Sequence, residues 1–409
     1  MDTIIVIGGG ASGIVSAISA KTKNNKVIVL ERNSNCLKKL LMTGNGKCNY
    51  FNDDQSFDKY YSIDSSIINS IITDNNMDLV IDFFNKLGVV YKKKNGYYYP
   101  FSNQASTIKE ILLGEALRLG VLIECDSLVT DICVKENGFE VYVNDKNIFC
   151  NKLIISTGSK AYPKTGSDGM GYSFLSKLGH SIIKPLPALV PLICDFKYAK
   201  EWAGIRSDVI ISLYEDDCFI KEESGEIQLT DYGISGICTF NLSHVITRGL
   251  NDGKSEIVKI NFVPFIDGDV FEWVDNYCLG FPDKNICECL NGFLNNKLVS
   301  VILKSCGISF DKKYCDLKNF EKKQLVECLY NFSLKICDVK SFDFSQVCNG
   351  GVRLSEINPL TFESKIVNNL YITGELLDLN GLCGGYNLTV AWLSGLLAGK
   401  SAGDISVEN

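Results

Sequence analysis

The feature that most constrains the fold is a glycine-rich segment that directly follows a β-branched run near the amino terminus. Residues 3–7 read Thr-Ile-Ile-Val-Ile, which is typical of a strand buried on both faces. Residues 8–13 read Gly-Gly-Gly-Ala-Ser-Gly and contain the pattern G-x-G-x-x-G, and residues 14–18 continue at helical spacing. A second β-branched run at 26–30 ends at Glu31. This order predicts the strand–turn–helix–strand unit of a Rossmann-like dinucleotide-binding domain.

The residues of this segment have distinct physical roles. Gly8 permits the tight turn, Gly10 lets the backbone approach a pyrophosphate, and Gly13 lets the helix pack closely on the strand. Unpaired N–H groups and the positive end of the helix dipole favour an anion at the helix start. Glu31 is placed to accept hydrogen bonds from an adenosine ribose, which favours a free 2′-hydroxyl. The segment therefore predicts FAD or NAD rather than NADP.

Three later segments favour FAD over NAD. Residues 151–158 form a predicted strand that ends in Thr157-Gly158, and residues 370–378 form one that runs into Gly374-Glu375. Gly384 and Gly385 then open a helical pattern that starts with Tyr386 and Asn387. The dipole of that helix would stabilise negative charge on the N1/O2 edge of a reduced flavin. Residues 166–171 fit G-x-x-G-x-G only loosely and follow no strand, so we expect no dedicated NAD(P)H domain.

Irregular loops give the chain a resemblance to a known family. These loops are residues 39–49 (Lys-Leu-Leu-Met-Thr-Gly-Asn-Gly-Lys-Cys-Asn), 161–167, 186–192, 232–236, 350–352 and 363–365. Over almost its whole length the chain resembles the BaiN-like, aminoacetone-oxidase-type FAD-binding flavoproteins. Lys47 stands where arginine is usual in that family, so a bidentate phosphate contact becomes a point-charge contact. Ile237 replaces a usual proline and Met170 a common acid, which leaves substrate details open.

The resemblance implies an α/β fold in which a Rossmann-like FAD-binding domain is interrupted by an insertion. We expect the first part of that domain over 1–188 and the second over 346–409. Short apolar runs with turn signals predict an inserted antiparallel β domain over 189–265, including a strand at 237–240. Helical spacing predicts a small helical subdomain over 266–345, with one helix spanning 286–298, and residues 56–88 are expected to be helical.

Composition excludes several classes of protein. The formal net charge is −7 and no basic run is longer than the three lysines at 92–94, which argues against a nucleic-acid partner. Seventeen cysteines include no CxxC pair, and no secretory leader is recognisable, so we expect reduced thiols and a cytoplasmic location. His180 and His244 are the sole histidines, so we expect no metal site. No apolar run is long enough for a membrane span, and the oligomeric state is left open.

The candidate site residues come from the motifs and from the family resemblance. Tyr232 is the candidate catalytic residue, because its phenol could polarise a carbonyl or donate a proton over the flavin, although a packed tyrosine is an equally good interpretation. Cys48 could be a redox partner, but no second cysteine lies nearby in sequence. The predicted FAD-binding residues are Gly8, Gly10, Ala11, Ser12, Gly13, Glu31, Arg32, Lys39, Gly44, Gly46, Lys47, Cys48, Val129, Thr157, Gly158, Gly374, Glu375, Gly384, Gly385, Tyr386 and Asn387.

These features leave several functions open. The first is an FAD-dependent oxidoreductase that reduces a conjugated enone of a steroid- or bile-acid-like small molecule, with NADH or NADPH as a transient electron donor, as the resemblance implies. A flavin oxidase of small amines is the second, and an FAD-containing RNA-modifying protein is the third. A non-catalytic flavin-stabilised scaffold is the fourth. The FAD oxidoreductase is our prediction; the substrate and the electron donor are not determined by the sequence.

Overall fold

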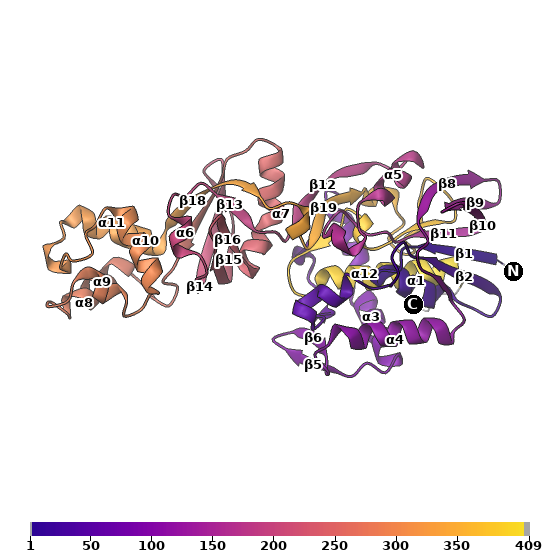
Figure 1. Cartoon of the computed structure of the whole chain (residues 1–409), viewed down its shortest axis with the longest axis horizontal. Coiled ribbons are helices and arrows are strands. Elements are labelled where there is room, and N and C mark those ends of the chain that lie inside the picture. Colours follow the sequence, from indigo (N-terminus) through magenta and orange to yellow (C-terminus); the bar gives the residue numbers. More distant parts are fainter. Residues whose placement is uncertain (1, 405–409) are drawn as a thin grey trace. The chain divides into compact units, whose positions relative to one another are not determined.

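A computed structural model of the chain describes residues 2–404 (Figure 1). The chain divides into two compact units. The first comprises residues 1–186 and 346–409, and the second comprises residues 187–345. Because the second unit is one continuous stretch of sequence, it is an insertion into the first.

The first unit is built on a parallel five-stranded sheet with the strand order β20-β11-β1-β2-β7. The strands are β1 (Asp2–Ile7), β2 (Asn25–Leu30), β7 (Leu122–Glu124), β11 (Lys152–Ile155) and β20 (Leu370–Ile372). Most side chains of the three central strands are buried, as expected for a parallel sheet covered on both faces. The chain leaves β1 toward β2 on one side and reaches β11 on the other, so a topological switch point lies between β1 and β11.

Six helices and several small sheets surround this sheet among the described residues. The helices are α1 (Ala11–Ala20), α2 (Ser65–Ile71), α3 (Asp74–Lys86), α4 (Ala105–Arg118), α5 (Met170–Lys177) and α12 (Tyr386–Ala402). The smaller sheets join β8 (Val129–Lys135), β9 (Gly138–Val143) and β10 (Lys146–Cys150); β3 (Phe51–Asn52), β5 (Tyr91–Lys94) and β6 (Tyr97–Pro100); β4 (Tyr60–Tyr61) and β21 (Asn380–Gly381); and β12 (Ile182–Ala188) and β19 (Val347–Val352).

Helices α1 and α12 pack with their backbones in unusually close approach. A Cβ atom added at Gly395 of α12 would lie 2.6 Å from the carbonyl oxygen of Ser12 in α1. One turn later, a Cβ at Gly399 would lie 2.4 Å from the carbonyl oxygen of Ser16. The close crossing therefore requires glycine on α12. It holds the last long helix against the helix that starts at the glycine-rich turn (Figure 1).

The second unit contains a closed six-stranded barrel in the order β13-β16-β15-β14-β17-β18. Its strands are β13 (Leu192–Cys194), β14 (Arg206–Glu215), β15 (Cys218–Leu229), β16 (Gly233–Gly236), β17 (Glu256–Asn261) and β18 (Phe332–Val339). The expected strand at 237–240 is wrong, because helix α7 (Ile237–Asn251) begins there and buries an apolar side that includes Leu242 and Ile246. Short apolar runs of this kind fit a buried helix and a strand equally well.

Helices follow the fifth barrel strand along the chain. They are α8 (Val270–Leu279), α9 (Ile286–Leu290), α10 (Asn296–Cys306) and α11 (Asn319–Tyr330), and a short helix α6 (Ala199–Trp202) precedes β14. The single helix expected over 286–298 is instead split, because Asn295 caps the start of α10 through its side chain. Strand β18 returns to the barrel beside β13 and β17, so residues 266–345 are not helical throughout.

Two further structural points concern predictions made from the sequence. Residues 56–88 contain the helices α2 and α3, but also strand β4, so the expectation of helix throughout is wrong at its start. Within the described residues, no helix combines the length and the apolar character that crossing a lipid bilayer requires. The predicted α/β class with a Rossmann-like domain and an antiparallel β insertion is confirmed.

Candidate functional site

The turn between β1 and α1 has the geometry that its glycines predict. Gly8 has a φ of +103°, and a Cβ there would lie 2.5 Å from the carbonyl oxygen of Ser156 on the neighbouring strand end. A Cβ at Gly13 would lie 1.9 Å from the carbonyl oxygen of Gly8. Gly10, in contrast, faces open space, since nothing lies within 4 Å of its Cβ position. The first-turn N–H groups at Ala11 and beyond have no acceptor inside the helix and border this space.

Glu31 stands at the end of β2, where the sequence predicted an acid for a ribose. It is buried, and its Oε2 accepts a hydrogen bond of 2.7 Å from the Gly9 N–H. Its Oε1 accepts from the Asn33 backbone N–H at 2.8 Å and from the Asn33 side-chain amide at 2.7 Å. The carboxylate therefore fixes the glycine turn and its own loop. Oε1 thus accepts two hydrogen bonds, whereas Oε2 accepts one and keeps lone-pair capacity for a further donor.

Val129 and Arg32 are two further predicted site residues, and both belong to segments next to Glu31. Val129 starts β8 and is buried, and Ser127, two residues earlier, donates its backbone N–H to the carbonyl oxygen of Glu31 at 2.9 Å. Arg32 is exposed and forms an ion pair with Asp168. Its guanidinium also lies 3.4 Å from the carbonyl oxygen of Gly166. Arg32 thus binds the loop at 166–168.

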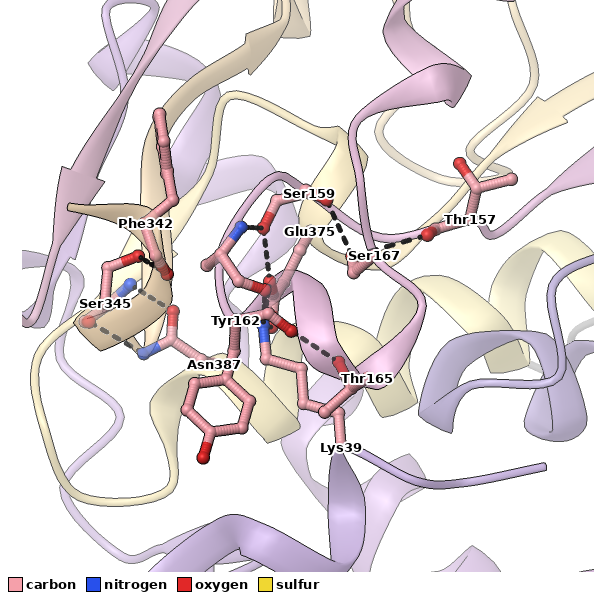
Figure 2. Close-up of polar contacts among 12 residues, drawn as sticks. Lys39, Thr157, Ser159, Tyr162, Thr165, Ser167, Phe342, Ser345, Glu375 and Asn387 are labelled. Carbon is pink, nitrogen blue, oxygen red and sulfur yellow. Dashed lines mark hydrogen bonds and ion pairs between the residues drawn. The ribbon is translucent and has the colours of Figure 1, made fainter. Parts of the chain in front are cut away.

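Lys39 and Glu375 meet at the carboxyl ends of the central strands, although they are far apart in sequence. The Lys39 ammonium lies 2.6 Å and 2.8 Å from the two carboxylate oxygens of Glu375. Ser159 donates its hydroxyl to the same carboxylate at 2.7 Å, and Lys39 also approaches the carbonyl oxygen of Ala161 (Figure 2). Both charged side chains are mostly buried, with exposed fractions of 28% and 23%. This ion pair ties the loop at 39 to the segment after β20.

The segment at 374–375 also contacts the start of α1. Gly374 has a φ of +67°, and a Cβ there would lie 2.5 Å from the Ser12 hydroxyl oxygen. The Gly374 N–H donates to the Ser394 hydroxyl of α12 at 2.9 Å. Between these strands, the Ser156 and Thr373 hydroxyls share a hydrogen bond of 2.6 Å. The structure therefore brings together the ends of β1, β11 and β20, as the order of the motifs predicts.

The loop at 44–49 lies against the start of α12. Gly44, Gly46 and Cys48 all have positive φ values. A Cβ at Gly385, the N-cap of α12, would lie 3.0 Å from the Phe51 backbone and 3.2 Å from the Asn49 side-chain oxygen. Lys47 is exposed on this loop.

Cys48 is fully buried in this loop. Burial raises the pKa of the Cys48 thiol to about 12, so it stays protonated at neutral pH. A thiol that stays protonated is a poor redox partner. The structure therefore favours a packing role for Cys48 over a redox role.

The first residues of α12 form a second helix amino terminus at the site. Asn387 donates its side-chain amide to the carbonyl oxygen of Gly381 at 2.8 Å and accepts from the Gly381 N–H at 2.9 Å. Asn52 donates to the carbonyl oxygen of Gly384 at 3.0 Å, and Tyr386 is buried against Tyr60. Asn387 therefore holds the preceding turn.

The residues present fit a bound dinucleotide. Besides the open space over Gly10, two buried side-chain oxygens at the site have no hydrogen-bond partner among residues 2–404: Oδ1 of Asn49 and Oγ1 of Thr157. Buried polar atoms are normally paired, so an unpaired one at a strand end or a helix start suits a polar ligand. Thr157 and Gly158, which has a φ of +74°, lie one residue beyond the end of β11. The described residues contain no group of three or more side chains placed to hold a metal ion.

Several polar residues of the site were missed by sequence reasoning, among them Ser159, Asn33 and Asn49. Each is a polar residue within four positions of a predicted site residue, which is the signal that could have found it. Ser159 and Asn33 bind the carboxylates of Glu375 and Glu31 respectively.

Tyr232 is the one predicted site residue that belongs to the second unit. It lies in the turn before β16, where its carbonyl oxygen accepts the Cys194 N–H at 3.0 Å. The Lys340 ammonium lies 3.8 Å from the centroid of its ring, a cation–π contact. Burial raises the pKa of the Tyr232 phenol, which therefore stays protonated at neutral pH.

A hydrogen-bonded series of Ser364, His180 and Glu356 has the appearance of a catalytic triad. Ser364 Oγ lies 2.9 Å from His180 Nε2, and His180 Nδ1 lies 3.1 Å from a Glu356 carboxylate oxygen. However, Ser364 is buried and its Oγ already accepts the backbone N–H groups of Ile366 and Val367. This serine cannot be reached by a substrate, so we interpret the series as structural.

Comparisons with known proteins identify the family of this chain. The family model described as "HI0933-like protein Rossmann domain" matches residues 2–401. The chain is 36% identical over 408 residues to the 3-dehydro-bile acid Δ(4,6)-reductase of Clostridium scindens, covering 99% of this chain and 100% of that protein. It is 26% identical to the ribosomal RNA dihydrouridine synthase of Escherichia coli, covering 97% and 98% of the two chains.

A solved structure shows the same fold at low identity. The 3-ketosteroid-Δ4-(5α)-dehydrogenase of Rhodococcus jostii has a TM-score of 0.51 at 14% identity, over 98% of this chain and 96% of that one. The family predicted from the loops is thus confirmed, and the reductase name of the 36% identical relative agrees with the predicted oxidoreductase. The bile acid reductase agrees with the BaiN-like resemblance of the loops. The match over almost all of the chain shows that this protein belongs to the HI0933-like Rossmann family.

Proposed function

We propose that this protein is an FAD-dependent oxidoreductase that reduces a carbon–carbon double bond conjugated to a carbonyl in a steroid- or bile-acid-like small molecule. The observation that carries the proposal is the 36% identity over the full length of a 3-dehydro-bile acid Δ(4,6)-reductase. The glycine turn, the open space over Gly10 and the two helix amino termini support it, because they suit a dinucleotide at the carboxyl edge of the parallel sheet.

Each part of the site would have its own role toward the cofactor. The Gly10 backbone and the start of α1 would hold the pyrophosphate, and Glu31 would receive a ribose hydroxyl beside its existing bonds. Thr157, Gly374 and the start of α12 lie toward the other end of the dinucleotide in this proposal. Bound FAD supplies hydride transfer. The protein's part is to orient the cofactor, exclude water and favour negative charge at the amino end of α12.

Tyr232 remains our candidate proton donor to the reduced substrate. Its protonated phenol has the chemistry for that role, since proton donation needs a group that keeps its proton at working pH. Tyr232→Phe is expected to leave the FAD content unchanged and to slow reoxidation of the reduced flavin by substrate about 100-fold. Tyr330→Phe, which removes the hydroxyl of an exposed tyrosine at the end of α11, is the matched control. Equal reoxidation rates for Tyr232→Phe and the unchanged protein would remove this assignment.

The proposal is tested by one series of flavin measurements on the purified protein. The visible absorbance spectrum is expected to show bound flavin, and anaerobic titration with NADH and with NADPH identifies the donor. Addition of a 3-oxo-Δ4,6 bile acid to the reduced protein should restore the oxidised spectrum and yield a product with one double bond fewer. A flavin-containing protein that no unsaturated ketone reoxidises would refute the enone reductase.

The same series separates the alternatives. Uracil also carries a double bond conjugated to a carbonyl, and two relatives at 26% and 27% identity are ribosomal RNA dihydrouridine synthases. Reoxidation by a ribosomal RNA fragment and not by the bile acid would therefore favour RNA modification, against the net charge of −7. Reduction of the flavin by a small amine, with release of peroxide and ammonia in air, would favour an amine oxidase.

A further inference from the structure

Lys340, in the inserted unit, lies against the ring of the candidate proton donor Tyr232. Its ammonium is 3.8 Å from the centroid of the Tyr232 ring and 5.7 Å from the centroid of the Phe344 ring. Both distances are within the roughly 6 Å over which a cation–π contact acts. The ammonium forms no ion pair with a carboxylate among residues 2–404. A positive charge that no carboxylate neutralises is therefore held beside the phenol.

The barrel holds the backbones of both residues through one strand. Strand β13 pairs with β16 on one side and with β18 on the other. The Cys194 N–H, at the end of β13, donates to the carbonyl oxygen of Tyr232 at 3.0 Å. The Lys340 N–H, directly after β18, donates to the carbonyl oxygen of Pro191 at 3.0 Å, directly before β13. The contact between the two side chains is thus built into the inserted unit itself.

Proton donation would give this phenol a negative charge. When Tyr232 gives its proton to the carbon next to the carbonyl of an enone, its O–H bond breaks, a C–H bond forms, and the electron pair stays on the phenolate oxygen. The other carbon of the double bond takes up the hydride of the proposed reaction, so atoms and electrons balance. A positive charge within about 4–6 Å favours the ionised form of an acid, so it stabilises the phenolate as it develops.

We infer that Lys340 is a positioning residue for this proton transfer, because its ammonium orients the Tyr232 ring and stabilises the phenolate that the transfer leaves. The inference rests on the proposed function, in which Tyr232 is the proton donor. Burial and the adjacent Asp231 raise the pKa of the Tyr232 phenol. The Lys340 ammonium acts against both, since it favours the ionised phenol.

The segments around the pair carry few other charged groups. Asp338 of β18 accepts the Val339 N–H at 2.8 Å, and Asp343 precedes Phe344. Strand β13, which separates β16 from β18, reads Leu-Ile-Cys and carries no charge. Among these groups, Lys340 supplies the positive charge.

The effect of this charge is measured on the full-length protein with 3,5-difluorotyrosine in place of Tyr232, whose more acidic phenol ionises before lysine does. Its fluorine NMR signal reports that ionisation directly and requires no turnover. In Lys340→Gln the midpoint of the titration is expected to rise by about one pH unit, because loss of an opposite charge disfavours the phenolate. Lys340→Arg keeps the charge and should keep the midpoint. Lys335→Gln, at an exposed lysine of β18, is the matched control and should leave the midpoint unchanged.

A kinetic comparison connects the charge to the reaction. Lys340→Gln is expected to slow reoxidation of the reduced flavin by a saturating 3-oxo-Δ4,6 bile acid about tenfold at neutral pH, because a weaker acid donates its proton more slowly. The substrate concentration for half-saturation and the FAD content should stay the same. In the Tyr232→Phe background the substitution should have no further effect, since Lys340 acts through that phenol. An equal further loss in that background would overturn the positioning role.

Failure of this inference is distinguishable from failure of the proposed function. If no unsaturated ketone reoxidises the unchanged protein, the enone reductase is refuted and the role of Lys340 with it. If a ketone does reoxidise it and Lys340→Gln shifts neither the fluorine titration nor the rate, the role of Lys340 alone is refuted.

Discussion

At the scale of single residues, the glycines of the first turn differ in what a side chain would meet. A Cβ at Gly13 would lie 1.9 Å from a backbone oxygen, whereas one at Gly10 would meet nothing within 4 Å. The fold therefore needs glycine at position 13. At position 10 it does not, so the absence of a side chain there points to a ligand. Glycine at position 13 is thus required for folding, and glycine at position 10 for ligand binding.

This difference predicts opposite effects of two substitutions. Gly13→Ala is expected to lower the free energy of unfolding by about 2–4 kcal/mol, because the backbone oxygen of Gly8 cannot move aside. Gly10→Ala should unfold as the unchanged protein but bind FAD at least about tenfold more weakly, because the methyl group enters the open space. Urea unfolding and fluorescence titration with FAD measure the two effects. Unaltered FAD affinity in Gly10→Ala would argue against a pyrophosphate at this turn.

The ion pair of Lys39 and Glu375 allows a second residue-scale prediction. Lys39→Gln leaves the Glu375 carboxylate with one donor, the Ser159 hydroxyl, and should lower the free energy of unfolding by about 1–2 kcal/mol. A double-mutant cycle with Glu375→Gln should give a coupling energy of about 1 kcal/mol. Lys38→Gln is the matched control, since the Lys38 ammonium donates to the Asn33 side-chain oxygen and not to Glu375. Additive effects in the cycle would show that the pair contributes nothing to stability.

At the scale of elements, the crossing of α1 and α12 positions both helix starts at the site. Ser12 and Ser16 of α1 receive Gly395 and Gly399 of α12, so the two backbones approach more closely than any larger residue would permit. Ser394 of α12 also accepts a hydrogen bond from the Gly374 N–H through its hydroxyl. A shift of α12 would therefore disturb the segment after β20 together with the helix start at Gly385. The positions of both segments of the site therefore depend on the close crossing of α1 and α12.

Gly399→Val tests this dependence. The branched side chain would have to displace the Ser16 carbonyl, so we expect the free energy of unfolding to fall by at least about 3 kcal/mol and the FAD content to fall with it. Gly114→Ala in α4 is the control, since nothing lies within 4 Å of its Cβ position and alanine is the better helix former by about 1 kcal/mol. Thermal unfolding of both variants supplies the comparison. A Gly399→Val protein as stable as the unchanged protein would contradict the close crossing.

At the scale of the whole molecule, the inserted unit carries two buried titratable groups with opposite effects on stability. Burial, with smaller contributions from Lys221 and Arg248, lowers the pKa of His244 from 6.5 to about 3. Burial and the nearby Glu215 raise the pKa of Glu256 from 4.5 to about 8. His244 is therefore neutral in the folded unit at neutral pH, and Glu256 retains its proton.

These pKa values predict a stability plateau for the inserted unit. Between pH 4.5 and 6.5 the unfolded chain gains a proton at His244 while the folded unit keeps one at Glu256, so the two effects cancel. Above pH 6.5 the Glu256 effect alone remains, and stability should fall by up to about 1.4 kcal/mol per pH unit as far as pH 8. Below pH 4.5 the His244 effect alone remains, and stability should fall on further acidification as far as pH 3.

Urea unfolding at several pH values measures the plateau. Glu256→Gln should abolish the fall above pH 6.5, and His244→Gln should reduce the fall below pH 4.5. Glu272→Gln, on α8 at some distance in sequence from both groups, serves as the control and should leave the profile unchanged. A profile of Glu256→Gln that still declines above pH 6.5 would show that another group is responsible.

Local sequence alone determined much of this protein. The β-branched run, the glycine spacing and the acid at Glu31 predicted the first strand–turn–helix–strand unit, because strand period and glycine conformation depend on neighbouring residues. The same reasoning placed strands before Thr157 and Gly374 and a helix after Gly385. Short apolar runs were less informative. Residues 237–240 begin α7 rather than a strand, since four apolar residues fit either element once both are buried.

Only the tertiary structure decided which distant groups meet. The pairing of Lys39 with Glu375 and the hydrogen bonds from Gly9 and Asn33 to Glu31 leave no mark on local sequence. Closure of the barrel by β18 was likewise not predictable from its neighbours in sequence. The physical reason is that such contacts depend on how whole elements pack, and packing is set by the shape of buried side chains across the entire chain.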